Sequence, residues 1–128
     1  AGATHIAEAL KVNTTLTSID LGYTQLGTDG IAPIAQALKV NTTLNTIDLS
    51  YNQINVDGAE QIAELLKVNK TLTFIDLLDN DIDNEGATFI AEAMEVNTTV
   101  TAIPIAWFDD EDWCQQIEAA CERNSQLK

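Results

Sequence analysis

One eleven-residue phrase returns four times at a fixed distance along the chain. It reads KVNTTLTSIDL at 11–21, KVNTTLNTIDL at 39–49, KVNKTLTFIDL at 67–77 and EVNTTVTAIPI at 95–105. Each copy starts 28 residues after the previous one. Other positions keep the same step, namely Gly2, Gly30, Gly58 and Gly86, and Ile6, Ile34, Ile62 and Ile90. A fixed period of this length is typical of a solenoid in which every repeat is one supersecondary unit.

Each repeat contains two apolar patterns with different periods. Ile47 and Leu49 alternate with Asp48, as on a short strand whose apolar side chains face one way. The second pattern has the i, i+3, i+4, i+7 spacing of one helix face, in Ala59, Ile62, Ala63 and Leu66. The repeat therefore predicts one strand followed by one helix, which is an α/β fold.

Residues that suit helix ends stand at the expected places. Asn55 and Asp83 are predicted N-caps, and Asp57 and Glu85 put acidic groups into the first turns. Lys11, Lys39 and Lys67 lie near the predicted C-terminal ends of the helices. A cation is favourable there because it interacts with the helix dipole.

The stretch from Gly2 to Ile105 resembles the ribonuclease-inhibitor-like leucine-rich repeats, whose helical repeats read LxxLxLxxNxLxxxGaxxLaeaLkxNxt. The match recurs through most of the chain without a gap. The resemblance implies a leucine-rich-repeat horseshoe with a parallel β-sheet on the concave face and helices on the convex face. The subclass occurs in ribonuclease inhibitors, GTPase-activating proteins for Ran, NOD-like receptors and tropomodulins, so the resemblance does not select a partner.

Two positions depart from the pattern. Thr24 stands where later repeats have Asn52 and Asn80, which predicts a weaker hydrogen-bonded turn in the first repeat. Pro33 lies inside the second predicted helix, where one backbone hydrogen bond is lost. Both departures indicate a natural, drifted repeat.

The two ends of the array are expected to differ. We expect leucine-rich repeats over 1–105, with four strands and an incomplete first repeat, and a capping segment over 106–128. The strand over 16–21 is then an edge strand, and such edges are normally paired, capped or shielded. Two alternatives follow: the chain is a fragment of a longer protein, or this edge pairs in an oligomer.

The segment after Ile105 loses the repeat. Its acidic run at 109–112 suits a helix N-terminus, and apolar groups share one face at Trp113, Ile117, Ala120 and Cys121. The tail around Asn124 echoes the Val-Asn-Thr-Thr-Leu phrase of the repeats. We therefore expect a fifth helix that caps the array, with a binding role as the alternative.

Composition excludes several classes of partner. Six basic against 20 acidic residues give a net charge of -14, which opposes binding to nucleic acid or to anionic membranes. No apolar run approaches the roughly 20 residues of a membrane-spanning helix, and the first residues lack the order of a signal peptide. We expect one soluble, cytoplasmic domain. Cys114 and Cys121 would lie about 10.5 Å apart along a helix, too far for a disulfide, and are expected as reduced core thiols.

Two motifs are explained by the repeat itself. Four N-x-Thr sequons, at Asn13, Asn41, Asn69 and Asn97, fall at one helix end, where Asn tolerates a left-handed C-cap, so they are expected without glycosylation. The carboxylates of Asp79, Asp81 and Asp83 imitate a calcium loop. Its sixth position is Asn84 and its twelfth is Ile90, so at most a weak, adventitious site is expected.

The sequence contains few residues that could act as catalytic groups. The single histidine, His5, is expected on the surface, and the sequence has no Gly-rich phosphate loop and no paired metal-ligand spacing. We expect no enzyme activity, no cofactor and no metal.

The strand residues between the inward leucines should form rows on the concave face, because stacked repeats place equivalent positions side by side. The rows are Ser18, Thr46, Phe74 and Ala102; Asp20, Asp48, Asp76 and Pro104; Gly22, Ser50, Leu78 and Ala106; and Tyr23, Tyr51, Asp79 and Trp107. Stacked carboxylates repel, and a basic group docked there would relieve them. The alternative is that this aspartate merely belongs to the repeat consensus.

Aromatic and apolar groups beside acidic ones are typical of protein interfaces. We predict a protein-protein interaction module that binds a partner with a basic and apolar surface. The predicted contact residues are Asp20, Tyr23, Asp48, Tyr51, Phe74, Asp76, Leu78, Asp79 and Trp107, with most weight on Phe74, Leu78 and Trp107. The alternative is a regulator of a small GTPase or an actin-filament-end binding protein, because EALKVNTTL is similar to tropomodulin repeats. An arginine finger would have only Arg123 to use.

Overall fold

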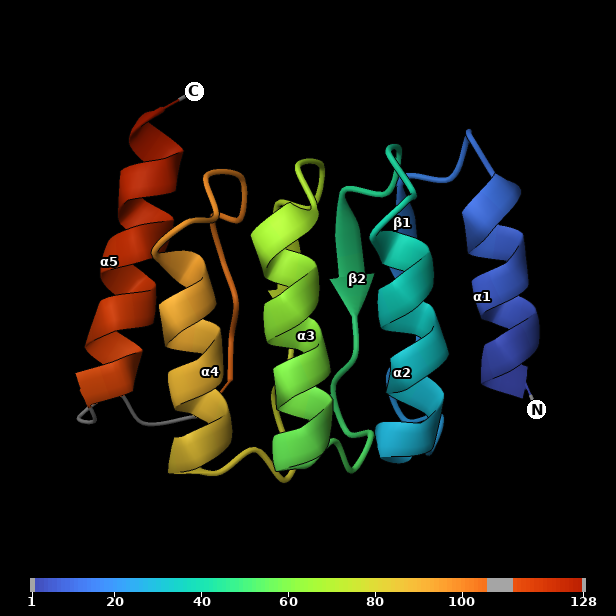
Figure 1. Ribbon diagram of the computed structural model, residues 1–128, viewed down its shortest axis with the longest axis horizontal. Coiled ribbons are helices and arrows are strands. Elements are labelled where there is room, and N and C mark those ends of the chain that lie inside the picture. The colour runs from blue at the N-terminus through green and yellow to red at the C-terminus, as the bar shows by residue number, and fades with distance from the viewer. Residues whose placement is uncertain (1, 106–111, 128) are drawn as a thin grey trace.

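A computed structural model of the chain describes residues 2–105 and 112–127. Helices and strands alternate along it (Figure 1). Their order is α1 (Gly2–Val12), β1 (Ser18–Asp20), α2 (Gly27–Leu38), β2 (Thr46–Asp48), α3 (Val56–Val68), β3 (Phe74–Asp76), α4 (Asn84–Met94) and α5 (Asp112–Gln126). The five predicted helices are confirmed.

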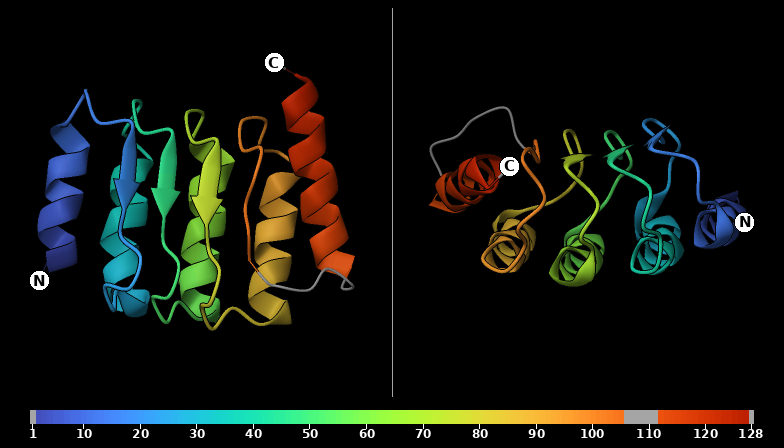
Figure 2. Two further views of the ribbon diagram at one scale, coloured as in Figure 1. Left: turned by 180° about the vertical axis from the view of Figure 1, so that it is seen from behind. Right: turned by 90° about the horizontal axis from the view of Figure 1, so that it is seen from above.

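The strands form one parallel sheet in the order β1-β2-β3. The register keeps the 28-residue step, since Ser18 pairs with Thr46 and Thr46 with Phe74. Helices α1 to α4 lie on one side of the sheet, α5 stands at the C-terminal end of the array, and seen from above the helices form an arc around the strands (Figure 2). The leucine-rich-repeat architecture is therefore confirmed, with the sheet on the concave side.

The prediction of a fourth strand was wrong within the described residues. Only an isolated bridge between Phe74 and Ala102 continues the sheet. The carbonyl of Pro104 still accepts from the Leu77 N–H at 2.8 Å. Because proline has no N–H, Pro104 cannot donate back to β3, and the ladder stops after one bridge.

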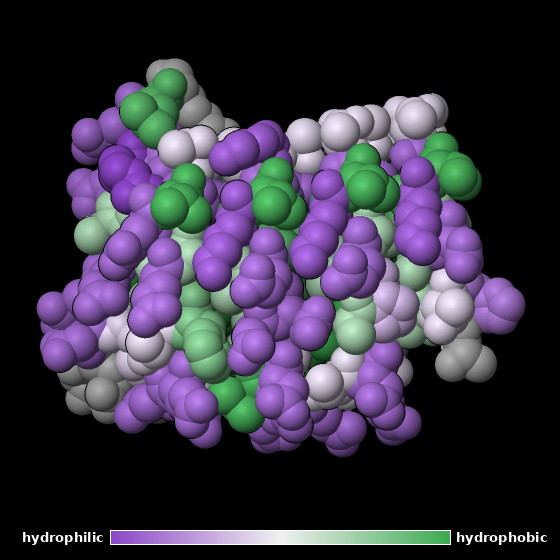
Figure 3. All heavy atoms as spheres, viewed as in Figure 1, coloured by the Kyte–Doolittle hydropathy of each residue, from purple (hydrophilic) through white to green (hydrophobic). Residues whose placement is uncertain are grey.

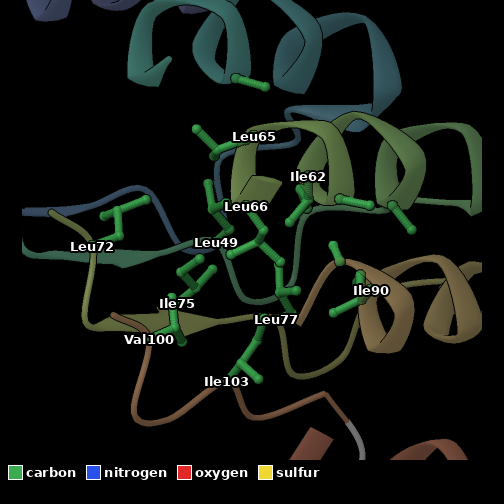
Figure 4. Packing of buried hydrophobic residues seen from close by; sticks show 14 of the residues in the cluster. Leu49, Ile62, Leu65, Leu66, Leu72, Ile75, Leu77, Ile90, Val100 and Ile103 are labelled. Carbon is green, nitrogen blue, oxygen red and sulfur yellow. The ribbon is translucent and has the colours of Figure 1, made fainter. Parts of the chain in front are cut away.

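The core lies between the sheet and the helices. Ile47 and Leu49 point inward and are 1% and 2% exposed, as the alternating pattern predicts, while Asp48 faces out. Figure 4 shows side chains of the β3 strand, such as Ile75, converging with Ile62 of α3 and Ile90 of α4. Each such side chain contributes roughly 1.5–3 kcal/mol on burial, so the stacked layers hold the array together.

The recurrent glycine of each repeat allows close packing of neighbouring helices. A Cβ added at Gly58 would lie 2.5 Å from Ile54 Cγ2 and 3.3 Å from Ile31 Cγ2 of the preceding helix. A Cβ at Gly86 would lie 3.0 Å from Ala59 Cβ. At Gly58 and Gly86, any larger residue would force the neighbouring side chains to shift.

The predicted N-caps are confirmed. The Asn55 side chain accepts from the N–H groups of Asp57 and Gly58, at 3.1 and 3.3 Å. The Asp83 carboxylate accepts from the Gly86 N–H at 3.0 Å. Each cap satisfies backbone donors that a helix start leaves open.

The sequon asparagines bind one repeat to the next. The Nδ2 groups of Asn41, Asn69 and Asn97 donate to the carbonyls at the C-terminal end of the previous helix, which are Leu10, Leu38 and Leu66 at 2.8, 2.8 and 3.0 Å. Asn69, the C-cap of α3, has φ −76 and ψ 135, so the predicted left-handed cap was wrong. These three side chains are buried, which leaves their amide nitrogens no room for a glycan.

A second set of asparagines closes the turn after each strand. Asn52 Oδ1 accepts from the N–H groups of Thr24 and Leu26, and its Nδ2 donates to the Leu21 carbonyl at 2.8 Å. Thr24, which replaces the asparagine in the first repeat, makes one hydrogen bond within its turn: its hydroxyl donates to the Leu21 carbonyl at 2.7 Å. The first turn is thus completed from the second repeat.

Helix α5 packs on α4 through the predicted apolar face. Trp113, Ile117, Ala120 and Cys121 are all buried, and the Trp113 Nε1–H donates to Asn84 Oδ1 at 2.9 Å. Both cysteines are buried, and neither forms a disulfide. Across residues 2–105 and 112–127, no helix is both long enough and apolar enough to cross a membrane.

Candidate functional site

The outward side chains of the sheet form the predicted rows. Ser18, Thr46 and Phe74 lie side by side, as do Asp20, Asp48 and Asp76. The Thr46 hydroxyl donates to Ser18 Oγ at 2.7 Å, which links the first two strands on this surface. We call these two rows the sheet face.

Each aspartate of the sheet face stabilises the turn that follows it by a hydrogen bond. One oxygen of Asp20, Asp48 and Asp76 accepts from the N–H two residues later, in Gly22, Ser50 and Leu78, at 2.9, 2.9 and 3.0 Å. Asp48 also accepts from the Ser50 hydroxyl at 2.6 Å. The consensus interpretation of this aspartate therefore has a structural basis.

A pair of stacked tyrosines stands at the carboxyl ends of β1 and β2. The ring centroids of Tyr23 and Tyr51 are 4.1 Å apart, with an angle of 11° between the ring planes. Tyr23 is 71% exposed and Tyr51 39%. Such a pair gains stability beyond its buried area, but its large exposed surface is unusual for aromatic side chains and marks it as an interaction candidate.

The Tyr51 hydroxyl is fixed by its neighbours. It lies beside the side chains of Asp79 and Tyr23, and hydrogen bonding to them is the main influence on its pKa. The bond to Asp79, followed by the bond to Tyr23, holds the pKa of Tyr51 well above its usual range. Three residues of one predicted row are thereby brought together.

Gln25 and Gln53, which were not among the predicted contact residues, lie beside the tyrosines. A hollow of about 340 Å³ is lined by Tyr23, Gln25, Tyr51, Gln53, Asp79 and Asp81. We call it the tyrosine hollow. The two glutamines occupy one repeat position, 28 residues apart, and that recurrence was the available signal.

The glutamines are positioned by the turn asparagines. Gln25 has φ 57 and Gln53 has φ 60, the left-handed region. The N–H groups on either side of Gln53, from Asn52 and Ile54, both donate to Asn80 Oδ1 at 2.9 and 3.0 Å. Two donors that converge on one oxygen force the residue between them into this conformation.

Other predicted contact residues take less exposed positions. Phe74 and Leu78 are half-buried rather than fully exposed. Trp107 lies outside the described residues. The sheet face and the tyrosine hollow therefore contain the predicted residues Asp20, Tyr23, Asp48, Tyr51, Phe74, Asp76 and Asp79.

The three aspartates of the supposed calcium loop have separate surroundings. Asp83 caps α4, Asp79 holds Tyr51, and Asp81 lines the tyrosine hollow. In the part of the chain that the structure describes, no group of three or more His, Cys, Asp or Glu side chains is placed to hold a metal ion. His5 is exposed on α1, as expected.

The helix side carries a different pattern. Figure 3 shows hydrophobic groups spaced along one edge of this side, over successive helix ends. The exposed valines of the repeat phrase occupy the ends of α1 to α4, namely Val12, Val40, Val68 and Val96, each next to Lys11, Lys39, Lys67 or Glu95. Three of the six basic residues thus lie at the helix ends, away from the acidic sheet face.

Arg123 closes the C-terminal end of the array. Its guanidinium donates to the carbonyls of Met94 and Asn97, at 2.9 and 2.7 Å, and to Asn124 Oδ1. The Nδ2 of Asn124 donates to the Val100 carbonyl at 2.8 Å. The guanidinium is committed to the fold, so the arginine-finger hypothesis loses its candidate.

Comparisons with solved structures support the fold described above. A structure titled "Leiomodin-1 Actin-Binding Site 2 (ABS2)" matches with a TM-score of 0.88 and 24% sequence identity, over 98% of this chain and 73% of that one. The C-terminal domain of Caenorhabditis elegans tropomodulin matches with a TM-score of 0.66 and 14% identity, over 99% of this chain and 95% of that one. At such identities the likeness concerns the fold alone.

Sequence comparison gives the family. No curated protein shows a significant match to the chain. The profile described as "Leucine Rich repeat" matches residues 12–35, 40–63 and 68–91, which is more than half of the chain and follows the 28-residue step. The chain therefore belongs to the leucine-rich repeat family.

Proposed function

We propose that this chain is a protein-binding module and that actin is its partner. The observation that carries the proposal is the fold match to the leiomodin-1 structure, whose title names an actin-binding site and which this chain follows over 98% of its length. The tropomodulin domain gives the same overall fold at a lower score. Of the functions considered from the sequence, actin binding thus has the most support.

The sheet face supplies surface for such a contact. Its outer rows combine carboxylates with the half-buried ring of Phe74, and the exposed tyrosine pair continues the surface at one end. Tyrosine and other aromatic residues dominate the energetic centres of protein interfaces. A net charge of -14 favours a contact patch on the partner that is basic and apolar.

The test measures binding to both forms of actin. The chain is sedimented with actin filaments, and its affinity for monomeric actin is measured by fluorescence anisotropy in a non-polymerising buffer. We expect saturable binding to at least one form, weakened by added salt because charged side chains contribute.

The double variant Asp48→Asn/Asp76→Asn tests the surface. Asparagine keeps an oxygen that can accept the turn N–H, so the variant removes charge without opening the turn. The matched control is Glu60→Gln/Glu92→Gln, which removes the same charge from exposed positions on α3 and α4. We expect about a tenfold loss of affinity for the first variant and little change for the control. Absence of binding to either form of actin, or equal effects of both variants, would overturn the proposal.

A further inference from the structure

We infer that the tyrosine hollow binds an arginine side chain presented by the partner protein. The inference rests on the proposed function only in taking the arginine from a protein; the geometry of the hollow is independent of which protein that is. About 340 Å³ is the lower end of the range for small-ligand pockets, which suits one side chain rather than a folded element.

One wall of the hollow is flat and aromatic. The rings of Tyr23 and Tyr51 are stacked, with centroids 4.1 Å apart and an angle of 11° between the ring planes. A guanidinium group is planar, weakly hydrated and stacks on aromatic faces, where the ring quadrupole attracts its charge. Because both tyrosines line the hollow, the pair offers aromatic surface to such a group.

The remaining lining is rich in hydrogen-bond acceptors. Asp79 and Asp81 bring two carboxylates, Gln25 and Gln53 bring two amide oxygens, and no basic residue lines the hollow. Arginine carries five N–H donors and no acceptor, and its paired donors match a carboxylate in two-point contact. The lining complements this donor set and disfavours an anionic ligand.

Alternative cations fit the hollow less well. A lysine ammonium has three donors and no flat face, so it gains less from the tyrosine pair. A divalent metal ion would need more ligands than the two carboxylates available, and the described residues contain no metal-binding group of three or more acidic, histidine or cysteine side chains. An arginine side chain can contact the tyrosine pair and the hydrogen-bond acceptors at the same time.

The experiment titrates the isotope-labelled chain with three small probes and follows backbone and aromatic signals by nuclear magnetic resonance. The probes are N-acetyl-arginine amide, N-acetyl-lysine amide and N-acetyl-citrulline amide, the last being the uncharged isostere of the first. We expect the arginine probe to shift signals of residues 23, 25, 51, 53, 79 and 81. Lysine should bind more weakly, and citrulline should bind at least about threefold more weakly than arginine, because it lacks the charge.

Variants at the exposed lining sharpen the result. Tyr23→Leu keeps an apolar side chain but removes the aromatic face, and Asp81→Asn removes one charge. Each should weaken binding of the arginine probe about two- to fivefold. Glu60→Gln, an equal charge change on the helix side, should leave it unchanged. Equal shifts with citrulline, shifts centred elsewhere, or equal effects of Asp81→Asn and Glu60→Gln would overturn the inference.

The same variants separate this inference from the proposed function. If the arginine probe binds the hollow and actin does not bind the chain, the hollow stands and the partner is wrong. If actin binds and neither Tyr23→Leu nor Asp81→Asn weakens it, the hollow is not used for the partner and the inference fails.

Discussion

Equivalent repeat positions differ in hydrogen bonding and burial between the two ends of the array. At the C-terminal end, Arg123 donates to the carbonyls of Met94 and Asn97, and the equivalent carbonyls of the first repeat, Leu10 and Asn13, accept from Asn41 of the second. At the other end, Asn13 accepts with its Oδ1 from the N–H groups of Thr15 and Leu16, and no carbonyl within residues 2–105 and 112–127 accepts from its amide nitrogen. Burial differs in parallel, since Leu16 is 37% exposed whereas the equivalent Leu72 is fully buried.

This difference shows that a consensus residue has no fixed energetic value. Its contribution depends on whether a neighbouring repeat covers it, as expected for arrays whose stability is a sum of repeat and nearest-neighbour terms. Identical letters in the sequence should then respond differently to the same substitution.

The largest contrast is expected for the leucine that begins each strand segment. Leu72→Ala should lower the free energy of unfolding by about 2–5 kcal/mol, because Leu72 is 0% exposed and leaves a cavity. Leu16→Ala should cost less than about 1 kcal/mol, since water already reaches that side chain. Urea denaturation of both variants measures the difference. Equal losses would mean that the first repeat is covered by something else in solution.

The ladder asparagines should give the next largest contrast. Asn69→Ala removes a buried amide that donates to the Leu38 carbonyl and accepts from Thr71 and Leu72, and should cost about 2–4 kcal/mol. Asn13→Ala removes only local, exposed bonds and should cost about 1 kcal/mol or less. Thermal unfolding followed by circular dichroism is sufficient. A costlier Asn13 variant would contradict the comparison.

Removal of the arginine at the closed end should have a smaller, local effect. Arg123→Ala leaves the carbonyls of Met94 and Asn97 without their donor and should cost about 1–3 kcal/mol. Hydrogen exchange should speed up first in α5 and the end of α4, with β1 and β2 unchanged. Arg123→Lys keeps the charge but cannot reach both carbonyls with a planar group, and should fall between the wild type and Arg123→Ala. A uniform increase along the chain would contradict a local cap.

The least perturbing test needs no substitution. It probes the thiol of Cys121, which is a buried residue of helix α5. Burial raises the pKa of Cys121 from 9.0 to about 11, with a further raising contribution from Glu118 and lowering ones from Arg123 and the Ile103 N–H. At neutral pH the thiolate should therefore be about a hundredfold scarcer than for an ordinary cysteine, since two pKa units separate them. Alkylation with iodoacetamide, followed by peptide mass spectrometry, should be slow in the folded chain and fast in urea. Rapid alkylation of the folded chain would show that the cap is open.

The sequence alone predicted the features that depend on local pattern. The inward positions of Ile47 and Leu49 and the caps at Asn55 and Asp83 follow from alternation, helical spacing and side-chain chemistry within one repeat. The rows across the sheet followed from the 28-residue step. These parts needed no knowledge of distant contacts.

Features that depend on contacts between repeats were missed. The left-handed glutamines Gln25 and Gln53 are set by an asparagine of the next repeat, 27 residues later in each case. The role of the sequon asparagines was misjudged because their acceptors lie in the preceding helix. Phe74 and Leu78 are half-buried, which the pattern within a single repeat does not reveal.

The most direct test of the account is a hydrogen-exchange footprint of the chain with and without saturating actin. We predict protection along the sheet face and the tyrosine hollow, over residues 18–25, 46–53 and 74–81, and no change at the helix ends that carry Val12, Val40, Val68 and Val96. Protection confined to that valine edge, or no protection anywhere at saturating actin, would contradict the account.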